Sequence, residues 1–137
     1  AAVDSLPPDA HSRPLLFGVT VLTSFALGEM PGITAAPADF ALQLATGAAT
    51  WGLDGVVCSG QEAARIKAAA PGLRCLCPGI RPAGSDAGDQ RRIMTPAEAV
   101  AAGADYLVVG RPILAAPSPV TAARQILAEM DAVHQQR

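Results

Sequence analysis

The segment GVVCSGQEAARIKAAAPGLRCLCPGI, residues 55–80, decides the fold because it contains one complete structural unit. It begins and ends with apolar runs that are continuous rather than alternating, which is typical of strands covered on both faces in a parallel sheet. Between the runs, Ser59 and Glu62 have the spacing of a helix-capping box, and Pro71 and Gly72 form a stop signal. The segment therefore predicts a strand, a helix and a second strand in succession.

The same unit recurs along the chain. Four apolar runs predict strands, at residues 15–24, 55–59, 73–80 and 105–113. A segment with helical signals follows each run, at residues 37–49, 59–72, 95–103 and 118–137. In the third of these segments, Thr95 and Glu98 again have capping-box spacing, and Pro96 occupies the first helical position. Repeated strand–helix units predict a parallel sheet with right-handed crossovers and outer helices.

Four such units are half of a (β/α)₈ barrel, whose complete form has about 250 residues. A doubly wound sheet is the alternative, but its phosphate-binding fingerprint, G-x-G-x-x-G, does not follow the first apolar run. We therefore favour a single partial domain of the α/β class, residues 1–137, that forms half of a barrel. Residues 1–14 are expected to be the end of a preceding helix and a linker.

The composition limits the classes of function. Half of the residues are hydrophobic and 16% are charged, which is below the roughly 25% of an average soluble domain. The net charge of -2, without a basic stripe, does not indicate nucleic-acid binding, and no apolar run reaches the ~20 residues of a membrane span. Cys58, Cys75 and Cys77 lack metal-ligand spacing, and His11 and His134 lie near opposite ends, so no metal site is expected. We interpret the cysteines as small buried residues of a protein in the reducing cytoplasm.

Polar and flexible residues follow the third and fourth apolar runs. In barrels, the C-terminal ends of the strands hold the functional groups, and the loops after the last two strands often bind phosphate. CPGIRPAGSDAGDQRR, residues 77–92, follows the third run, and Gly110-Arg111 ends the fourth. The N–H of Gly110, the forked cation of Arg111 and the amide of Gln90 could bind a phosphate, and the glycines would let the loop close over it. A solvated loop with a salt-bridged arginine is an equally good interpretation of these residues alone.

Four motifs in order carry a resemblance to a known family. They are VTVLTS at residues 19–24, GLDGVVCS at 52–59, PGIRPAGSDAGDQRRIMTPAEA at 78–99 and AGADYLVVGRPI at 102–113. Together they closely resemble the C-terminal half of bacterial orotidine 5'-phosphate decarboxylase, in register from about Arg13 to Ile126. Cys77 is a small departure, because the family usually has Thr before Pro-Gly-Ile. The resemblance implies that the four units are the last four of the barrel.

The resemblance implies an enzyme of de novo pyrimidine biosynthesis that uses no cofactor and no metal and acts in the cytoplasm as a homodimer. It implies the conversion of orotidine 5'-monophosphate to uridine 5'-monophosphate (UMP) and CO₂, with neither nucleic acid nor a membrane as partner. Matching residue by residue places Thr23 against the pyrimidine, Pro78 beside the base, Arg81 on the loop that closes over the phosphate, and Gln90, Gly110 and Arg111 at the phosphate.

The family's catalytic groups are a lysine and an Asp-x-Lys-x-x-Asp motif from its N-terminal half, and this sequence has no such motif. Its single lysine, Lys67, is expected to be a solvated surface residue on a helix outside the barrel. We therefore expect the chain to carry binding residues without catalytic ones and to be inactive by itself. Two alternatives stay open: a sister barrel enzyme that acts on sugar phosphates, and a non-catalytic phosphate-binding module built from a half-barrel.

Overall fold

The computed structural model describes residues 3–7, 13–25, 28–30, 32–83 and 92–135. Its strands are β1 (Phe17–Val19), β2 (Gly55–Val57), β3 (Arg74–Cys77) and β4 (Tyr106–Leu107). Its helices are the 3₁₀ helix η1 (Val3–Ser5) and the α-helices α1 (Pro37–Thr50), α2 (Gly60–Ala69), α3 (Pro96–Ala101), α4 (Arg111–Leu114) and α5 (Pro119–His134). None of these helices is long and apolar enough to cross a membrane.

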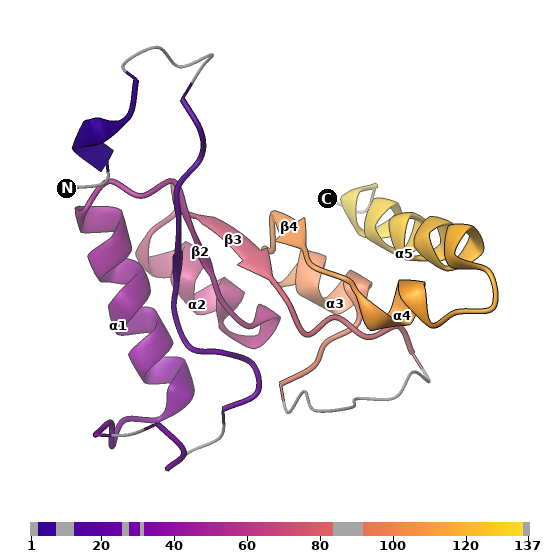
Figure 1. The fold of residues 1–137 in the computed structure, drawn as a ribbon, viewed down its shortest axis with the longest axis horizontal. Helices are drawn as coiled ribbons and strands as arrows, with labels where there is room; N and C mark the ends of the chain where they lie inside the picture. The colour runs from indigo at the N-terminus through magenta and orange to yellow at the C-terminus, as the bar shows by residue number, and fades with distance from the viewer. Residues whose placement is uncertain (1–2, 8–12, 26–27, 31, 84–91, 136–137) are drawn as a thin grey trace.

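The strands form one parallel sheet in the order β1-β2-β3-β4 (Figure 1). A doubly wound sheet reverses its strand order at the point where its ligand binds. Here each strand pairs with the next one along the chain, with Gly18 opposite Val56 and Val56 opposite Cys75. The predicted succession of four strand–helix units in a parallel sheet is therefore confirmed.

Both predicted capping boxes are present. The Ser59 N–H donates to Glu62 Oε2 at 3.0 Å, and the Ser59 hydroxyl accepts from the first turn of α2. At α3, the Thr95 N–H donates to Glu98 Oε2 at 2.8 Å, and the Glu98 N–H donates to Thr95 Oγ1 at 3.3 Å. The bonds from the N–H and the hydroxyl of Thr95 lower the pKa of Glu98. These side chains satisfy N–H groups that have no partner within a helix, which explains where α2 and α3 begin.

The fourth strand is shorter than the apolar run at residues 105–113 that predicted it. β4 ends after two residues, and a short helix, α4, begins at Arg111. The Gly110 carbonyl accepts two backbone N–H groups of α4, at 2.9 and 3.0 Å. Pro112 fits the first turn of a helix, because its missing N–H has no helical partner there. The prediction of a strand that extends to residue 113 is therefore wrong.

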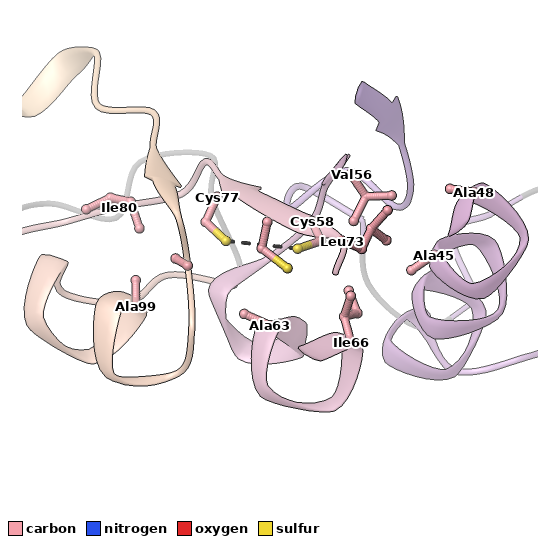
Figure 2. Close-up of a cluster of buried hydrophobic side chains, with 12 residues drawn as sticks. Ala45, Ala48, Val56, Cys58, Ala63, Ile66, Leu73, Cys77, Ile80 and Ala99 are labelled. Carbon is pink, nitrogen blue, oxygen red and sulfur yellow. Dashed lines mark hydrogen bonds between the residues drawn. The ribbon is translucent and has the colours of Figure 1, made fainter. Parts of the chain in front are cut away.

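The main hydrophobic core lies between the sheet and helices α1, α2 and α3 (Figure 2). Val56 and Cys77 contribute from the strands, and Ala63 and Ile66 contribute from α2. All four side chains are fully buried. The helices therefore cover one face of the sheet, as the outer helices of a barrel do.

The opposite face of the sheet carries the alternate strand residues. Val19 and Tyr106 are 62% and 42% exposed, and Val108, just after β4, is 47% exposed. In a barrel, alternate residues of each strand face the interior. This apolar face therefore corresponds to the interior wall of a barrel.

Lys67 is half-buried and paired, so the expectation of a solvated surface lysine is wrong. Its Nζ lies 2.7 Å from Asp105 Oδ2 and donates to the Leu73 carbonyl at 3.0 Å. Leu73 and Asp105 directly precede β3 and β4, so this contact lies at the amino edge of the sheet. The long lysine stem explains the difference, because it lets the ammonium group reach from α2 to the sheet.

The three cysteines are free and buried, as predicted. Cys58 Sγ and Cys77 Sγ are 3.9 Å apart. The hydrogen bond with Cys58 and burial both raise the pKa of the Cys75 thiol, so it stays protonated at neutral pH. Within the described ranges, no three His, Cys, Asp or Glu side chains are grouped so that they could hold a metal ion.

Candidate functional site

A cavity of about 470 Å³ opens at the carboxyl edge of the sheet. Five of the six predicted site residues line it, namely Thr23, Pro78, Arg81, Gly110 and Arg111. They come from the segments that follow β1, β3 and β4, and Cys58 lines the cavity from the segment after β2. Residues that are far apart in the sequence meet here because the carboxyl ends of parallel strands lie at the same edge.

Two larger hollows, of about 670 and 750 Å³, lie elsewhere. The first is beside Lys67 and Asp105 at the amino edge of the sheet. The second lies between Pro82 and α5 and is lined mainly by alanines and other small residues. We take the smaller cavity as the candidate site, because it gathers residues from the carboxyl ends of all four strands.

Thr23 lies in the segment that follows β1. Thr23 is 5% exposed, and Val21, two residues before it, is equally buried. The pairing of β1 with β2 extends into this segment, because Thr20 donates both its N–H, at 3.0 Å, and its hydroxyl, at 2.8 Å, to the Val57 carbonyl. The pairing with β2 thus continues one residue past β1, and Thr23 lies in the turn that follows.

Pro78 and Arg81 lie in the segment that follows β3. Gly79 has a φ of 77°, which turns the chain out of the strand. Arg81 is 7% exposed, and its guanidinium donates to the Ile80 carbonyl at 2.8 Å. The backbone N–H of Arg81 donates to the Met94 carbonyl at 2.9 Å. Arg81 is thus held at the base of the connection between β3 and α3.

Gly110 and Arg111 lie where the chain leaves β4 and enters α4. A Cβ built on Gly110 would meet no atom of the described residues within 4 Å, so the space beside this backbone is open. Arg111 is exposed and lines the same cavity. Gln90, the sixth predicted site residue, lies outside the described residues.

Arg92 and Glu62 form a buried ion pair at this edge that we did not expect from the sequence. Arg92 Nη1 donates to Glu62 Oε1, and Nη2 donates to the carbonyls of Val21 at 3.1 Å and Leu22 at 2.9 Å. Burial lowers the pKa of the Arg92 guanidinium. The sequence indicated Glu62 as a capping residue, but no local signal shows a partner 30 residues away.

The cavity combines two chemical environments. Arg81 and Arg111 contribute positive charge close to the open backbone at Gly110, which is suitable for a phosphate group. Val21, Thr23 and Pro78 contribute a mainly apolar wall with one hydroxyl, which is suitable for a planar ring with polar edges. The arrangement can therefore hold a phosphorylated ligand that also carries a ring.

Comparison with known proteins identifies the family of the chain. A family model described as "Orotidine 5'-phosphate decarboxylase / HUMPS family" matches residues 2–126. The orotidine 5'-phosphate decarboxylase of Nitratidesulfovibrio vulgaris (strain DP4) is 57% identical over 138 residues, which cover 97% of this chain and 59% of the relative. The protein of the same name from Lawsonia intracellularis is 51% identical over 126 residues, which cover 92% of this chain and 55% of the relative. The chain therefore spans less than two thirds of the length of these relatives.

Solved structures show the same relationship. The crystal structure of orotidine 5'-phosphate decarboxylase from Lactobacillus acidophilus matches with a TM-score of 0.71 and 34% identity, over 90% of this chain and 52% of that chain. The enzyme from Pyrococcus horikoshii OT3 matches with a TM-score of 0.62 and 26% identity, over 88% of this chain and 53% of that chain. The prediction of an α/β half-barrel is confirmed, because the chain matches about half of each structure.

Proposed function

The chain belongs to the orotidine 5'-phosphate decarboxylase / HUMPS family, and we propose that it forms the substrate-binding half of a decarboxylase of pyrimidine biosynthesis. The substrate would be orotidine 5'-monophosphate, and the products would be UMP and CO₂. The observation that carries the proposal is the cavity at the carboxyl edge, where five residues matched to substrate-binding positions of the family come together.

We assign the phosphate to the end of the cavity at Gly110 and Arg111. The open space beside Gly110 lets an oxyanion approach its backbone closely. The guanidinium of Arg111 can form two parallel charge-assisted hydrogen bonds to phosphate oxygens. In this proposal, the set of phosphate-binding residues also includes Gln90 and Arg81, which lies at the base of the adjoining segment.

We assign the pyrimidine and ribose to the end of the cavity at Thr23 and Pro78. The Thr23 hydroxyl can donate to or accept from the polar edge of a pyrimidine. The Pro78 ring is a rigid apolar surface that can border the base. Because Thr23 is 5% exposed, a ligand would have to enter the cavity to reach it.

The chain has no lysine at this site for the decarboxylation itself. Loss of CO₂ develops negative charge on the pyrimidine C6, and a cation placed there would stabilise the transition state. Lys67, the single lysine of the sequence, is bound to Asp105 at the amino edge, whereas the cavity lies at the carboxyl edge. We therefore propose that residues 1–137 are inactive alone and that a complementary half-barrel supplies the catalytic lysine and aspartates.

A hybrid barrel tests the proposal. The hybrid joins the part of the Nitratidesulfovibrio vulgaris decarboxylase that this chain does not match to residue 1 of the chain. The chain is 57% identical to the part of the relative that it replaces, so we expect the two parts of the hybrid to fit together. We expect the hybrid to bind UMP and to release CO₂ from orotidine 5'-monophosphate, and the 137-residue chain alone to release none above background. A hybrid that is folded by circular dichroism but binds no UMP would contradict the proposal. We also expect the hybrid to sediment as a homodimer and the native protein to act in the cytoplasm.

The position of Lys67 also supports a second candidate, a non-catalytic phosphate-binding module. This candidate predicts that the hybrid binds UMP and simple sugar phosphates equally well and releases no CO₂. The decarboxylase proposal predicts turnover and a clear preference for UMP over pentose phosphates. A preference for a pentose phosphate together with turnover of a sugar-phosphate substrate would instead indicate a sister barrel enzyme.

A further inference from the structure

A buried ion pair joins three of the segments that form the carboxyl edge of the sheet. The side chains of Arg92 and Glu62 are 13% and 1% exposed. Arg92 Nη1 donates to Glu62 in α2, while Nη2 donates to the carbonyls of Val21 at 3.1 Å and Leu22 at 2.9 Å. A single side chain that precedes α3 thus connects the start of α2 with the segment after β1.

Glu62 holds Arg92 in place because Glu62 is itself fixed. Its Oε2 accepts the Ser59 N–H at 3.0 Å in the capping box, and its Oε1 accepts from Arg92. A buried carboxylate is tolerated when its oxygens have such donors, and loss of one partner leaves an uncompensated charge. Displacement of Arg92 is therefore unfavourable, and its Nη2 stays beside the two carbonyls.

The two carbonyls that Nη2 binds directly precede Thr23. On one side of them, Thr20 makes the contact that extends the β1–β2 pairing. On the other side, the Phe25 N–H donates to the Leu22 carbonyl at 3.0 Å and closes a turn. The bonds from Nη2 fix the peptide groups that lead into Thr23, and the Thr23 side chain lines the cavity.

We propose that Arg92, held by Glu62, is a positioning residue that fixes Thr23 in the cavity and so sets the affinity for the base and ribose of the ligand. The inference rests on the proposed function. Arg92 is not among the described residues that line the cavity, and both of its terminal nitrogens donate to protein oxygens. Its role is therefore distinct from that of Arg111, which faces the cavity directly.

A double-mutant cycle in the hybrid barrel tests the inference. Arg92→Lys keeps a positive charge opposite Glu62, but a compact ammonium group cannot reproduce the fork that also binds two carbonyls. We expect each of the variants Arg92→Lys and Thr23→Ala to raise the Kd by a factor on the order of ten in calorimetric titrations. For each variant, this factor should be the same for UMP and for uridine. When Arg92→Lys is introduced into the Thr23→Ala variant, it should change neither Kd by more than about twofold. The reason is that the effects of two substitutions do not add when one residue acts through the other.

Two further variants control the experiment. Arg65→Lys changes an exposed arginine whose Nη2 lies 2.9 Å from Asp39 Oδ1, and it should leave both Kd values unchanged. Glu62→Gln should reproduce the Arg92→Lys pattern, and it serves as the test if Arg92→Lys does not fold. If neither variant folds by circular dichroism, the pair is purely structural and the inference is wrong.

The remaining outcomes separate this inference from the function on which it rests. Additive losses in the double variant, a loss for UMP without a loss for uridine, or no loss at all would each overturn the role of Arg92. If the unmutated hybrid binds no UMP, the proposed function fails and this inference falls with it. If the hybrid binds UMP and Thr23→Ala weakens it while Arg92→Lys does not, the proposed function stands and this inference alone is wrong.

Discussion

The ring of Phe17 meets the ring of Tyr106 edge to face, with the ring centroids 5.9 Å apart. Phe17 begins β1 and Tyr106 begins β4, so two strands lie between them. Neighbouring strands are about 4.8 Å apart, which would place β1 and β4 about 14 Å apart in a flat sheet. The two rings therefore lean toward each other across β2 and β3, on the face of the sheet that corresponds to the interior wall of a barrel.

Gly55 in β2 makes this contact possible. A Cβ on Gly55 would lie 2.3 Å from Phe17 Cε1 and 2.6 Å from the Arg74 carbonyl oxygen, which cannot move without distorting β3. We expect Gly55→Ala to lower the free energy of unfolding of the hybrid barrel by about 1–3 kcal/mol, measured by urea denaturation. Gly72→Ala is the matched control, because its Cβ would meet nothing within 4 Å. Equal urea midpoints for the two variants would show that the sheet relaxes around Gly55.

The parts of the fold that the sequence predicted correctly depend on contacts between residues close in the chain. Ser59 with Glu62 and Thr95 with Glu98 are three residues apart, so their spacing alone shows where α2 and α3 begin. The helix α4 was not predicted, because the continuous apolar run that precedes Gly110 is typical of a strand. Whether such a run stays in the sheet depends on neighbouring strands rather than on its own residues.

The contacts that the sequence did not predict join distant segments. Arg92 and Glu62 are 30 residues apart, and Arg92 and Val21 are 71 apart. Lys67 and Asp105 likewise belong to different strand–helix units. Charge and glycine patterns do not assign Thr23, Pro78 and Arg81 to a site. These three residues are assigned to it by the motif resemblance alone. The glycine, the arginine and the amide at Gly110, Arg111 and Gln90 indicate a phosphate site by their own chemistry.

The contact between Lys67 and Asp105 predicts that the single lysine is structural. Lys67→Met in the hybrid barrel should lower the free energy of unfolding by about 1 kcal/mol or less, because the pair is partly exposed. The kcat/KM for orotidine 5'-monophosphate should stay within about twofold of the unmutated value, because the contact lies at the edge of the sheet opposite the cavity. Loss of decarboxylation in a variant with unchanged urea unfolding would show that Lys67 takes part in the reaction.

Asp54 predicts a dependence of stability on pH. Arg13 Nη1 donates to Asp54 Oδ1 at 2.7 Å and the Leu16 N–H donates to Oδ2 at 2.8 Å, and these bonds hold the pKa of Asp54 below its ordinary value of 3.8. A carboxylate with a lowered pKa stabilises the fold above its unfolded pKa, and this stabilisation is lost as the pH falls through the folded pKa.

The Asp54→Asn variant tests this dependence. The hybrid barrel with Asp54→Asn should be less stable than the unmutated hybrid by a constant amount from about pH 7 to about pH 5, and the difference should shrink below about pH 4. Urea midpoints across this range measure it, with Asp131→Asn, at an exposed position of α5, as a control for the loss of one negative charge. A difference that stays constant down to about pH 2.5 would contradict the assignment of the contact to an ionised Asp54.

Arg111 predicts that the cavity distinguishes phosphorylated from unphosphorylated ligands. Arg111→Ala removes a charge-assisted hydrogen bond that only the phosphate can use, so UMP binding to the hybrid barrel should weaken by about 1.5–3 kcal/mol. Uridine binding should change little, because the wall at Thr23 and Pro78 is intact. Arg124→Ala, which removes an exposed arginine of α5 outside the cavity, should leave both affinities unchanged. Calorimetric titrations of the two ligands measure the difference, and an equal loss for both would show that Arg111 supports the fold of the site rather than binding phosphate.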